Sequence, residues 1–429
     1  MGRHLFGDHS SFTLLLLVPF YWVAGIEVLY LAQSACIALG AVFVFNFARA
    51  VGRNLRGALQ GENEWIALAC AISFLAHPAL GWANLENFHP DSALALFLPA
   101  VVYYGYVRRW RMFWLFAVLA MLTKEDVSLV LVPLGVWFCL ANRRSLDAQK
   151  ARYHGALVVT ASVIATLTMM FVVMRSLIGV PTRNGWRIPF GGPTGFLKSV
   201  FTRPLEVARH FLADSRPLYI LKMLLPTGLV FLAAPSLSLA AVVVLSTNIL
   251  STFWYQYHIE YHYSLAAVPA LVMGSAWAVT RMSRAAVRRT MAGVLLVSAL
   301  ATSFTYGTFN PSNTHTPSAV YQYATDADAL VAQVPDGVAV SVAHNVTTHL
   351  NHRKEVYMFP TPFKAKLYGV DAEWEGKRLE AADRVEWVLI PIKLEPEEAA
   401  VWESEQKAFV LVEANAHWRL FRRAARFPN

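Results

Sequence analysis

Ionisable side chains gather in four short stretches of this sequence, each beside a long apolar run. The stretches are GDHSS with Asp8 and His9, LENFHPD with Glu86, His89 and Asp91, TKED with Lys124, Glu125 and Asp126, and WYQYHIEYHYS with Tyr257, Glu260 and His262. Carboxylates and imidazoles can act as general bases, hold divalent cations or orient phosphate groups. Because ionisable groups beside membrane spans are costly, their presence here predicts a functional site.

Lys124, together with Arg183 or Arg187, is predicted to neutralise phosphate charge, and the aromatic residues around Glu260 suit sugar rings. Structural alternatives exist for each stretch. The aromatic residues can form a belt at a membrane interface, and Asp91 can cap a helix. The charges at 124–126 can form a local ion pair between two helix ends.

The histidine spacing does not predict a zinc site. His258 and His262 stand four residues apart, but the intervening residues, IEY, lack the Glu of an HExxH motif. The ligands of any metal therefore stay unknown at this level, and a divalent cation stays a candidate cofactor.

The composition excludes a water-soluble enzyme for most of the chain. Of the 429 residues, 56% are hydrophobic and 15% are charged, whereas soluble domains carry about 25% charged residues. Of the 28 Asp and Glu residues, 12 lie in residues 1–309 and 16 in the last 120, so an apolar body precedes a polar tail. The net charge of +9 comes from short basic clusters between apolar runs, which is typical of membrane topology and does not predict nucleic-acid binding.

The apolar runs predict about ten membrane spans, since a helix needs about 20 apolar residues to cross the bilayer. The runs cover approximately residues 27–48, 63–81, 92–107, 111–123, 127–141, 154–178, 216–233, 236–253, 262–280 and 289–308. The short fourth and fifth runs are expected to be two helices that meet at residues 124–126. Residues 1–26 are expected to form an outer loop with an interfacial helix at 11–22, and a rival interpretation takes them as a signal peptide.

Alternate connections carry the basic clusters, which predicts that the basic connections lie in the cytoplasm and the four ionisable stretches outside. The clusters are Arg49, Arg53 and Arg56; Arg108, Arg109 and Arg111; Arg143, Arg144, Lys150 and Arg152; and Arg281, Arg284, Arg288 and Arg289. We therefore expect a multi-pass plasma (inner) membrane protein. It combines a transmembrane domain at 27–308 with an extracytoplasmic α/β domain at 309–429, which has a helix at 318–334 and strands at 338–342, EVYMF, VEWVLIPI and FVLVEA.

These stretches, in this order, resemble the bacterial membrane proteins of domain of unknown function 2079. The matching segments run from GDHSSFTLLLLVPFYW, through the stretch around Gln33, LENFHPDSALALFLPA and TKEDVSLVLVPLG, to YHYSLAAVPALV and SVAHNVTTHLNHRKEVYMFP. That family is similar to the superfamily C glycosyltransferases, which take a sugar from a polyprenyl-phosphate carrier at the extracytoplasmic face. The family's usual first helix and following acid have no counterpart ahead of GDHSS, which leaves Asp8 as the first-loop acid.

The resemblance implies an α-helical polytopic fold and sugar transfer from a polyprenyl phosphate in the membrane. It implies Asp8 or Glu86 as the base, His89 as the group that orients the acceptor or phosphate, and Lys124 as the phosphate contact. Asp8, Glu86, His89, Lys124 and Glu260 are then expected to line one cavity. Two alternatives stay open: a transporter or lipid-binding membrane protein without catalysis, and a membrane-anchored module that binds a partner through its tail. The oligomeric state and the sugar cannot be predicted.

Overall fold

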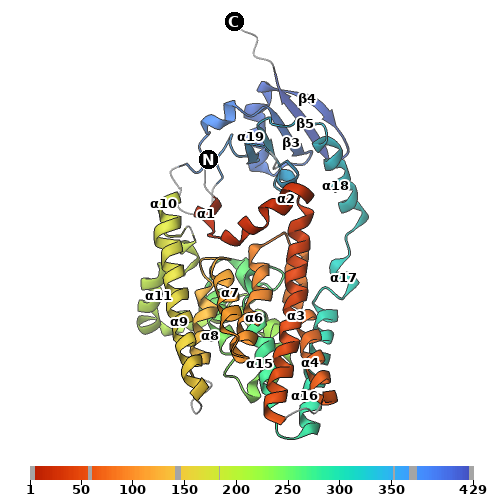
Figure 1. Cartoon of the computed structure of the whole chain (residues 1–429). Helices are drawn as coiled ribbons and strands as arrows, with labels where there is room; N and C mark the ends of the chain where they lie inside the picture. The colour runs from red at the N-terminus through yellow and green to blue at the C-terminus, as the bar shows by residue number, and fades with distance from the viewer. Residues whose placement is uncertain are drawn as a thin grey trace. The chain divides into compact units, whose positions relative to one another are not determined.

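The computed structural model describes residues 5–56, 60–140, 146–182, 184–350, 353–366 and 374–424. They divide into two compact units, with the division between Thr314 and His315. Figure 1 shows an N-terminal unit of helices and a C-terminal unit built on a sheet. Each unit is considered by itself.

The N-terminal unit is helical throughout. Its long and medium helices are α3 (Glu27–Arg56), α4 (Gln60–Leu75), α5 (Pro78–Leu85), α6 (Leu94–Tyr106), α7 (Trp110–Met121), α8 (Ser128–Leu140), α9 (Leu146–Thr168), α11 (Gly192–Thr202), α12 (Pro204–Leu212), α13 (Arg216–Leu224), α14 (Ala240–Leu250), α15 (Ala267–Arg281) and α16 (Ala285–Thr305). Its short elements are α1 (Leu5–Asp8), η1 (Phe12–Leu16), α2 (Val18–Ala24), η2 (Pro90–Ala93), η3 (Met169–Met174), α10 (Arg175–Ile178), η4 (Gly185–Arg187), η5 (Leu225–Thr227), η6 (Val230–Ala233), η7 (Trp254–Tyr257), η8 (His262–Ser264) and α17 (Pro311–Thr314).

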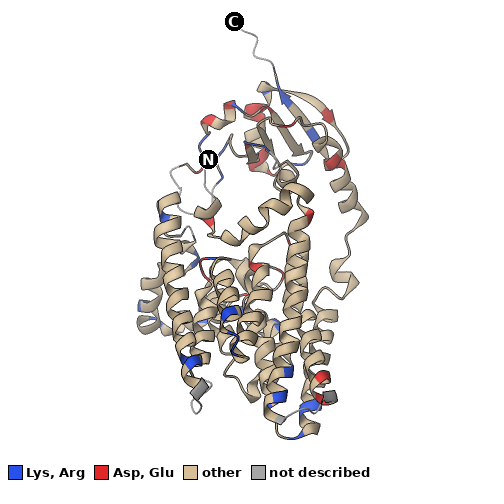
Figure 2. Cartoon of the chain, viewed as in Figure 1, with Lys and Arg blue, Asp and Glu red and all other residues tan. Residues whose placement is uncertain are grey.

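Among the described residues, four helical segments are long and apolar enough to cross a membrane: Glu27–Leu55, Ala148–Ile178, His262–Arg281 and Ala285–Thr305. A fifth span is available if Glu62–Leu75 and Pro78–Leu85, bent by 45°, act together. The other predicted runs fold as shorter helices, and in 216–233 the run is divided into α13 and the one-turn segments η5 and η6. Figure 2 shows Lys and Arg near the ends of α3 and α9 at the lower side of this unit.

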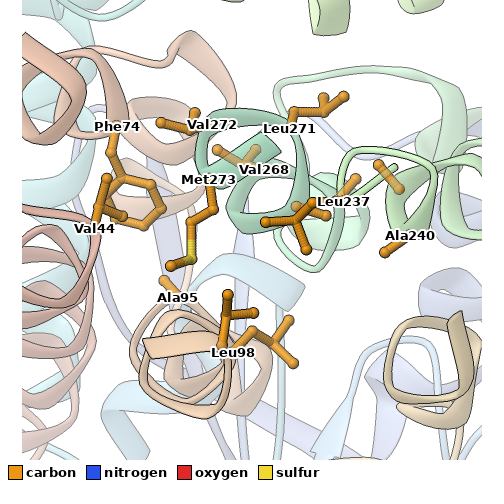
Figure 3. Packing of buried hydrophobic residues seen from close by; sticks show 14 of the residues in the cluster. Val44, Phe74, Ala95, Leu98, Leu237, Ala240, Val268, Leu271, Val272 and Met273 are labelled. Atoms are coloured by element: carbon orange, nitrogen blue, oxygen red, sulfur yellow. The ribbon is translucent and has the colours of Figure 1, made fainter. Parts of the chain in front are cut away.

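One continuous apolar core holds the N-terminal unit together. In Figure 3, Met273 of α15 lies between Val44 of α3 and Leu98 of α6, and Phe74 of α4 packs beside Val44. These side chains are almost completely buried. The core therefore fixes α3, α4, α6 and α15 as a rigid frame for the connections at their ends.

The helices α8 and α9 approach each other closely through two glycines. A Cβ atom on Gly135 would lie 2.8 Å from the carbonyl oxygen of Gly155, and one on Gly155 would lie 2.7 Å from the carbonyl oxygen of Gly135. Small residues permit such backbone contact in helix packing. This contact anchors α8, whose first residue follows the predicted break at 124–126. The break is confirmed, since α7 ends at Met121 and α8 begins at Ser128.

The C-terminal unit is built on a five-stranded sheet in the order β2-β1-β3-β5-β4. Its elements are α18 (Ser318–Val331), β1 (Val340–Val342), η9 (His344–Leu350), β2 (Val356–Met358), η10 (Glu380–Asp383), β3 (Trp387–Pro391), α19 (Pro396–Glu405), η11 (Gln406–Ala408), β4 (Phe409–Ala414) and β5 (Trp418–Arg423). The strands β2, β1 and β3 are parallel, and β5 pairs antiparallel with both β3 and β4. The sequence predicted the first four strands and missed β5 and α19.

Alternating burial packs both faces of this sheet. Leu389 of β3 joins Trp418 and Leu420 of β5 in one apolar cluster, while Val388 and Ile390 join a second cluster. The period-2 alternation expected of strands explains this division. The unit is thus a mixed α/β fold, with an antiparallel pair added to the parallel part that resembles half of a doubly wound sheet.

Candidate active site

A cavity of about 210 Å³ lies in the N-terminal unit where several helix connections meet. The lining comes from the segment after α1, the break between α7 and α8, the π-helical turn η3, the turn η4 and the connection after α14. Its polar lining residues are His9, Lys124, Glu125, Asp126, Thr182, Asn184, Arg187, Thr247, Ser251, Gln256 and Tyr263. Two cations, two carboxylates and an imidazole therefore share one hollow.

Lys124 is the centre of the charge network. Its Nζ donates to Asp91 Oδ2 at 2.7 Å, and both side chains are nearly buried. Although burial opposes ionisation of both groups, each charge stabilises the other, so the pKa of Lys124 is raised and that of Asp91 is lowered to about 2. The ammonium also lies 3.9 Å from Asp126 and 5.6 Å from the ring centre of Tyr263. The pair therefore keeps the Lys124 ammonium ionised at the cavity wall, with the Asp91 carboxylate as its partner.

Glu125 holds the N-terminal segment against this wall. Its Oε1 lies 2.8 Å from His9 Nδ1, and its Oε2 accepts the Ser10 N–H at 3.1 Å. Burial lowers the pKa of His9, but the hydrogen bond with Glu125 and the negative charges of Glu125 and Asp91 together raise it above the usual value. The backbone N–H of Thr13 adds a bond to the Leu122 carbonyl at 3.2 Å.

Arg187 is the second cation of the cavity. Its guanidinium carbon lies 4.3 Å from the ring centre of Phe253, 5.7 Å from Trp186 and 5.8 Å from Tyr263. Its Nη1 lies 3.5 Å from the Tyr263 hydroxyl, and its buried Nε has no hydrogen-bond partner among the described residues. No carboxylate of the described chain forms an ion pair with it. Aromatic rings thus hold this cation in place without neutralising it.

A smaller adjoining cavity is lined by Asp91, Lys124, Asp126, Thr247, Asn248, Gln256, His262 and Tyr263, together with apolar residues of α6, α8 and α14 and of the turns just before α8 and α15. Five residues belong to both cavities: Lys124, Asp126, Thr247, Gln256 and Tyr263. The side chain of Asp126 is 51% exposed. It is therefore a carboxylate that an entering ligand can reach.

Glu86, His89 and His262 meet beside the smaller cavity. Glu86 Oε1 lies 3.4 Å from His89 Nε2, and its Oε2 lies 3.4 Å from His262 Nδ1. The two imidazole rings stack with their centres 3.6 Å apart. Although burial raises the pKa of Glu86, the two imidazoles lower it to about 2.

These three side chains fit a divalent transition metal. Each offers one ligand atom, and the three atoms lie within 4.8 Å of one another. Neither His89 Nε2 nor His262 Nδ1 has a hydrogen-bond partner among the described residues. Two imidazole nitrogens and one carboxylate are a common zinc ligand set. The sequence argued against zinc from the spacing of His258 and His262 alone. That spacing cannot show that Glu86 and His89, which are distant in the chain, approach His262.

Gln33 of α3 holds the Glu86–His89 segment. Its Oε1 accepts the His89 backbone N–H at 3.0 Å, and its Nε2 donates to the Ala83 carbonyl at 3.2 Å. The side chain is 1% exposed. A buried amide in an apolar helix is costly unless it is hydrogen-bonded, so this contact fixes the loop to the helical frame.

The prediction that five site residues line one cavity does not hold for the larger cavity. Of Asp8, Glu86, His89, Lys124 and Glu260, only Lys124 lines the larger cavity. Asp8 is exposed at the end of α1, and Glu260 pairs with Lys222 at 3.3 Å.

The sequence also predicted Tyr257 and Arg183 as site residues. Tyr257 is also absent from both linings, because it is buried with the Arg216 guanidinium 4.2 Å from its ring centre. Arg183 lies outside the described residues.

The sequence did not single out Gln256 and Tyr263, which line both cavities. Their signal was present, since both belong to the aromatic stretch WYQYHIEYHYS. The sequence gives no indication of the part played by Met170, which lines the larger cavity from the π-helical turn η3. Such turns commonly mark functional positions in helices.

Comparison with known proteins supplies a family and a fold. The family profile described as "Predicted membrane protein (DUF2079)" matches residues 2–424. Two solved structures of ArnT from Cupriavidus metallidurans are similar. The apo structure has 13% identity and a TM-score of 0.53, covering 96% of this chain and 87% of that chain. The structure bound to undecaprenyl phosphate has 15% identity and a TM-score of 0.54, covering 99% and 90%. No curated protein sequence matches. The predicted polytopic helical fold with a C-terminal α/β domain is confirmed.

Proposed function

We propose that this chain, which belongs to the DUF2079 family of predicted membrane proteins, transfers a sugar from a polyprenyl-phosphate carrier to an acceptor outside the cytoplasm. One observation carries the proposal: Lys124 and Arg187 line the same cavity, and Arg187 has no carboxylate partner among the described residues. Structural similarity to a protein solved with undecaprenyl phosphate supports a polyprenyl-phosphate partner. Arginine and lysine are the usual phosphate-binding side chains.

In the proposed reaction, the oxygen of an acceptor hydroxyl attacks the anomeric carbon of the sugar. The bond between that carbon and the phosphate oxygen breaks, and the phosphate leaves with the electron pair. Lys124 and Arg187 stabilise the charge that develops on the phosphate, and a carboxylate takes the acceptor proton. A single displacement of this kind inverts the anomeric centre.

Asp126 is the best-placed base. It lines both cavities with a half-exposed side chain, and Lys124 lies 3.9 Å away. Glu86 is a weaker candidate, because its two oxygens face imidazoles and its pKa is low. Asp8, the other base implied by the family resemblance, is exposed and lines neither cavity.

Glu86, His89 and His262 are the proposed ligands of a divalent cation. Bound there, the metal would supply Lewis-acid polarisation beside the smaller cavity. Gln33 fixes the position of the His89 backbone, and the backbone N–H of His262 donates to Glu86 Oε2 at 2.8 Å. The role of the chain's own residues is thus to hold this ligand set close to the reacting groups.

The proposed location is the inner membrane, with the cavity and the C-terminal unit outside the cytoplasm. The basic ends of α3 and α9 in Figure 2 support this orientation under the positive-inside rule. A cysteine placed on the η7 turn and labelled from outside intact cells tests it. Labelling only after lysis would contradict the proposed orientation.

The activity is tested with the full chain in nanodiscs and undecaprenyl phosphate carrying a radiolabelled sugar, with membrane extract as the source of acceptor. Transfer of label by the wild type and its loss in Asp126→Asn are expected, with binding of the carrier unchanged. The matched control is Glu206→Gln, a 52% exposed carboxylate of α12. Binding of the carrier without transfer by any extract would instead favour a lipid-binding protein.

A further inference from the structure

Three aromatic rings, Trp254, Tyr255 and Tyr261, form a surface cluster next to the larger cavity, and we call them the aromatic cluster. The ring centres of Trp254 and Tyr255 lie 4.1 Å apart, and those of Tyr255 and Tyr261 lie 4.3 Å apart. Trp254 and Tyr261 meet edge to face at 5.5 Å. Trp254 is 44% exposed, while the two tyrosines are half-buried. The cluster therefore presents a firm aromatic surface.

The cluster is connected directly to the cavity wall. Phe253 lies 4.8 Å from the Tyr255 ring centre on one side and 4.3 Å from the Arg187 guanidinium on the other. Gln256, the residue after Tyr255, lines both cavities. A ligand that extends from the two cations past Phe253 would thus reach the cluster.

A charged residue stands next to the cluster in the chain. Glu260 precedes Tyr261 and binds Lys222 through one oxygen at 3.3 Å. Its other oxygen is buried without a hydrogen-bond partner in the described part of the chain. An unpaired buried carboxylate oxygen is unfavourable until a donor reaches it. Sugar hydroxyls are such donors, and sugar rings present apolar C–H faces to aromatic side chains.

We propose that the aromatic cluster binds a pyranose ring of the acceptor. This inference rests on the proposed function, which assigns Lys124 and Arg187 to the phosphate of the donor and so leaves the cluster for the acceptor. An acceptor sugar bound beside the donor would lie over Phe253 and contact the cluster. The tyrosine that the sequence singled out, Tyr257, is buried and takes no part.

A membrane-interface belt is the competing explanation for exposed aromatics. Helix α2 shows what such a surface looks like: Phe20, Trp22 and Val23 are 61%, 83% and 88% exposed, and that helix carries no charged residue. The aromatic cluster differs, since Glu260, the residue before Tyr261, forms an ion pair with Lys222. Charged groups beside the rings disfavour burial in lipid. Trp22 therefore provides a matched control.

The test uses the full chain in nanodiscs and saturation-transfer NMR with methyl α-glucopyranoside, methyl α-galactopyranoside and methyl α-mannopyranoside. At least one should receive saturation at its ring protons from the wild type. Trp254→Ala should weaken that binding about fivefold, the effect of one lost aromatic contact. Trp254→Leu, which keeps apolar volume, should do the same at unchanged Tm, and Trp22→Ala should have no effect.

Three results would overturn the proposal. The first is the absence of saturation transfer to all three pyranosides, and the second is its undiminished persistence in both Trp254 variants. The third is strong quenching by brominated lipid of the fluorescence that Trp254→Leu removes, which would assign the cluster to the membrane interface.

Binding of undecaprenyl phosphate is measured on the same samples. Lys124→Gln should lose that lipid and keep the pyranoside. If the wild type binds a pyranoside but no lipid phosphate, the proposed function fails while the saccharide site stands.

Discussion

Replacing Arg187 by glutamine should weaken lipid-phosphate binding more than it lowers the unfolding free energy. In the folded chain its guanidinium contacts three rings, those of Phe253, Trp186 and Tyr263, at 4.3–5.8 Å. Its one described hydrogen bond, to the Tyr263 hydroxyl, is long at 3.5 Å. Cation–π contacts contribute about 0.5–1 kcal/mol each at exposed sites. Because only the Phe253 contact is short and the other two lie near the limit of about 6 Å for such contacts, the variant should lose only about 1–2 kcal/mol of unfolding free energy.

The effect on ligand binding should be larger. A hydrogen bond between a guanidinium and a phosphate is worth about 1.5–3 kcal/mol, so Arg187→Gln should weaken undecaprenyl-phosphate binding roughly 10- to 150-fold. The dissociation constant is measured by native mass spectrometry in nanodiscs, with thermal unfolding on the same preparation. The control is Arg203→Gln, since Arg203 is 61% exposed and paired with Glu206 at 3.4 Å. Unchanged affinity in folded Arg187→Gln would refute the reasoning.

Three further outcomes are expected. Because the folded-state pKa of His9 is raised, its bond with Glu125 stabilises the fold fully below pH 6.5 and loses that effect as pH rises through the raised pKa; His9→Gln should flatten this part of the stability–pH profile, and an unchanged profile would disprove the assignment. Arg288→Met should cost about 1.5–3 kcal/mol in thermal unfolding, because Glu62 loses its bidentate hydrogen bonds at 3.0 Å while Arg289 stays 4.0 Å away; a loss under 1 kcal/mol would contradict this. Purified protein should hold about one zinc ion per chain by elemental analysis, and His89→Ala should lose it; equal zinc in both proteins would exclude the proposed ligand.

Sequence patterns predicted the elements whose local signals agree with their surroundings. The break at 124–126 was predictable, because three adjacent charges cannot lie inside an apolar helix at low cost. Strand β5 was missed, since three arginines in WRLFRR obscure the alternation that buries Trp418 and Leu420. The alternation itself was present in the sequence and is the signal that identifies the strand.

The sequence could predict which stretches contribute to the candidate site, but not the distances between their side chains. The sequence grouped Glu86, His89 and Lys124 by their expected side of the membrane. It could not show that His262, from a stretch about 170 residues away, would approach Glu86 to 3.4 Å. That approach depends on the packing of α15 against the frame of α3, α4 and α6, which no local pattern encodes.

The position of a bound lipid phosphate tests the central claim most directly. A cryo-electron microscopy structure of the full chain in nanodiscs with undecaprenyl phosphate would show it. The account predicts phosphate oxygens within hydrogen-bonding distance of both Lys124 Nζ and the Arg187 guanidinium, in the cavity that these residues share with Asp126. A phosphate bound elsewhere on the chain, with this cavity unchanged, would contradict it.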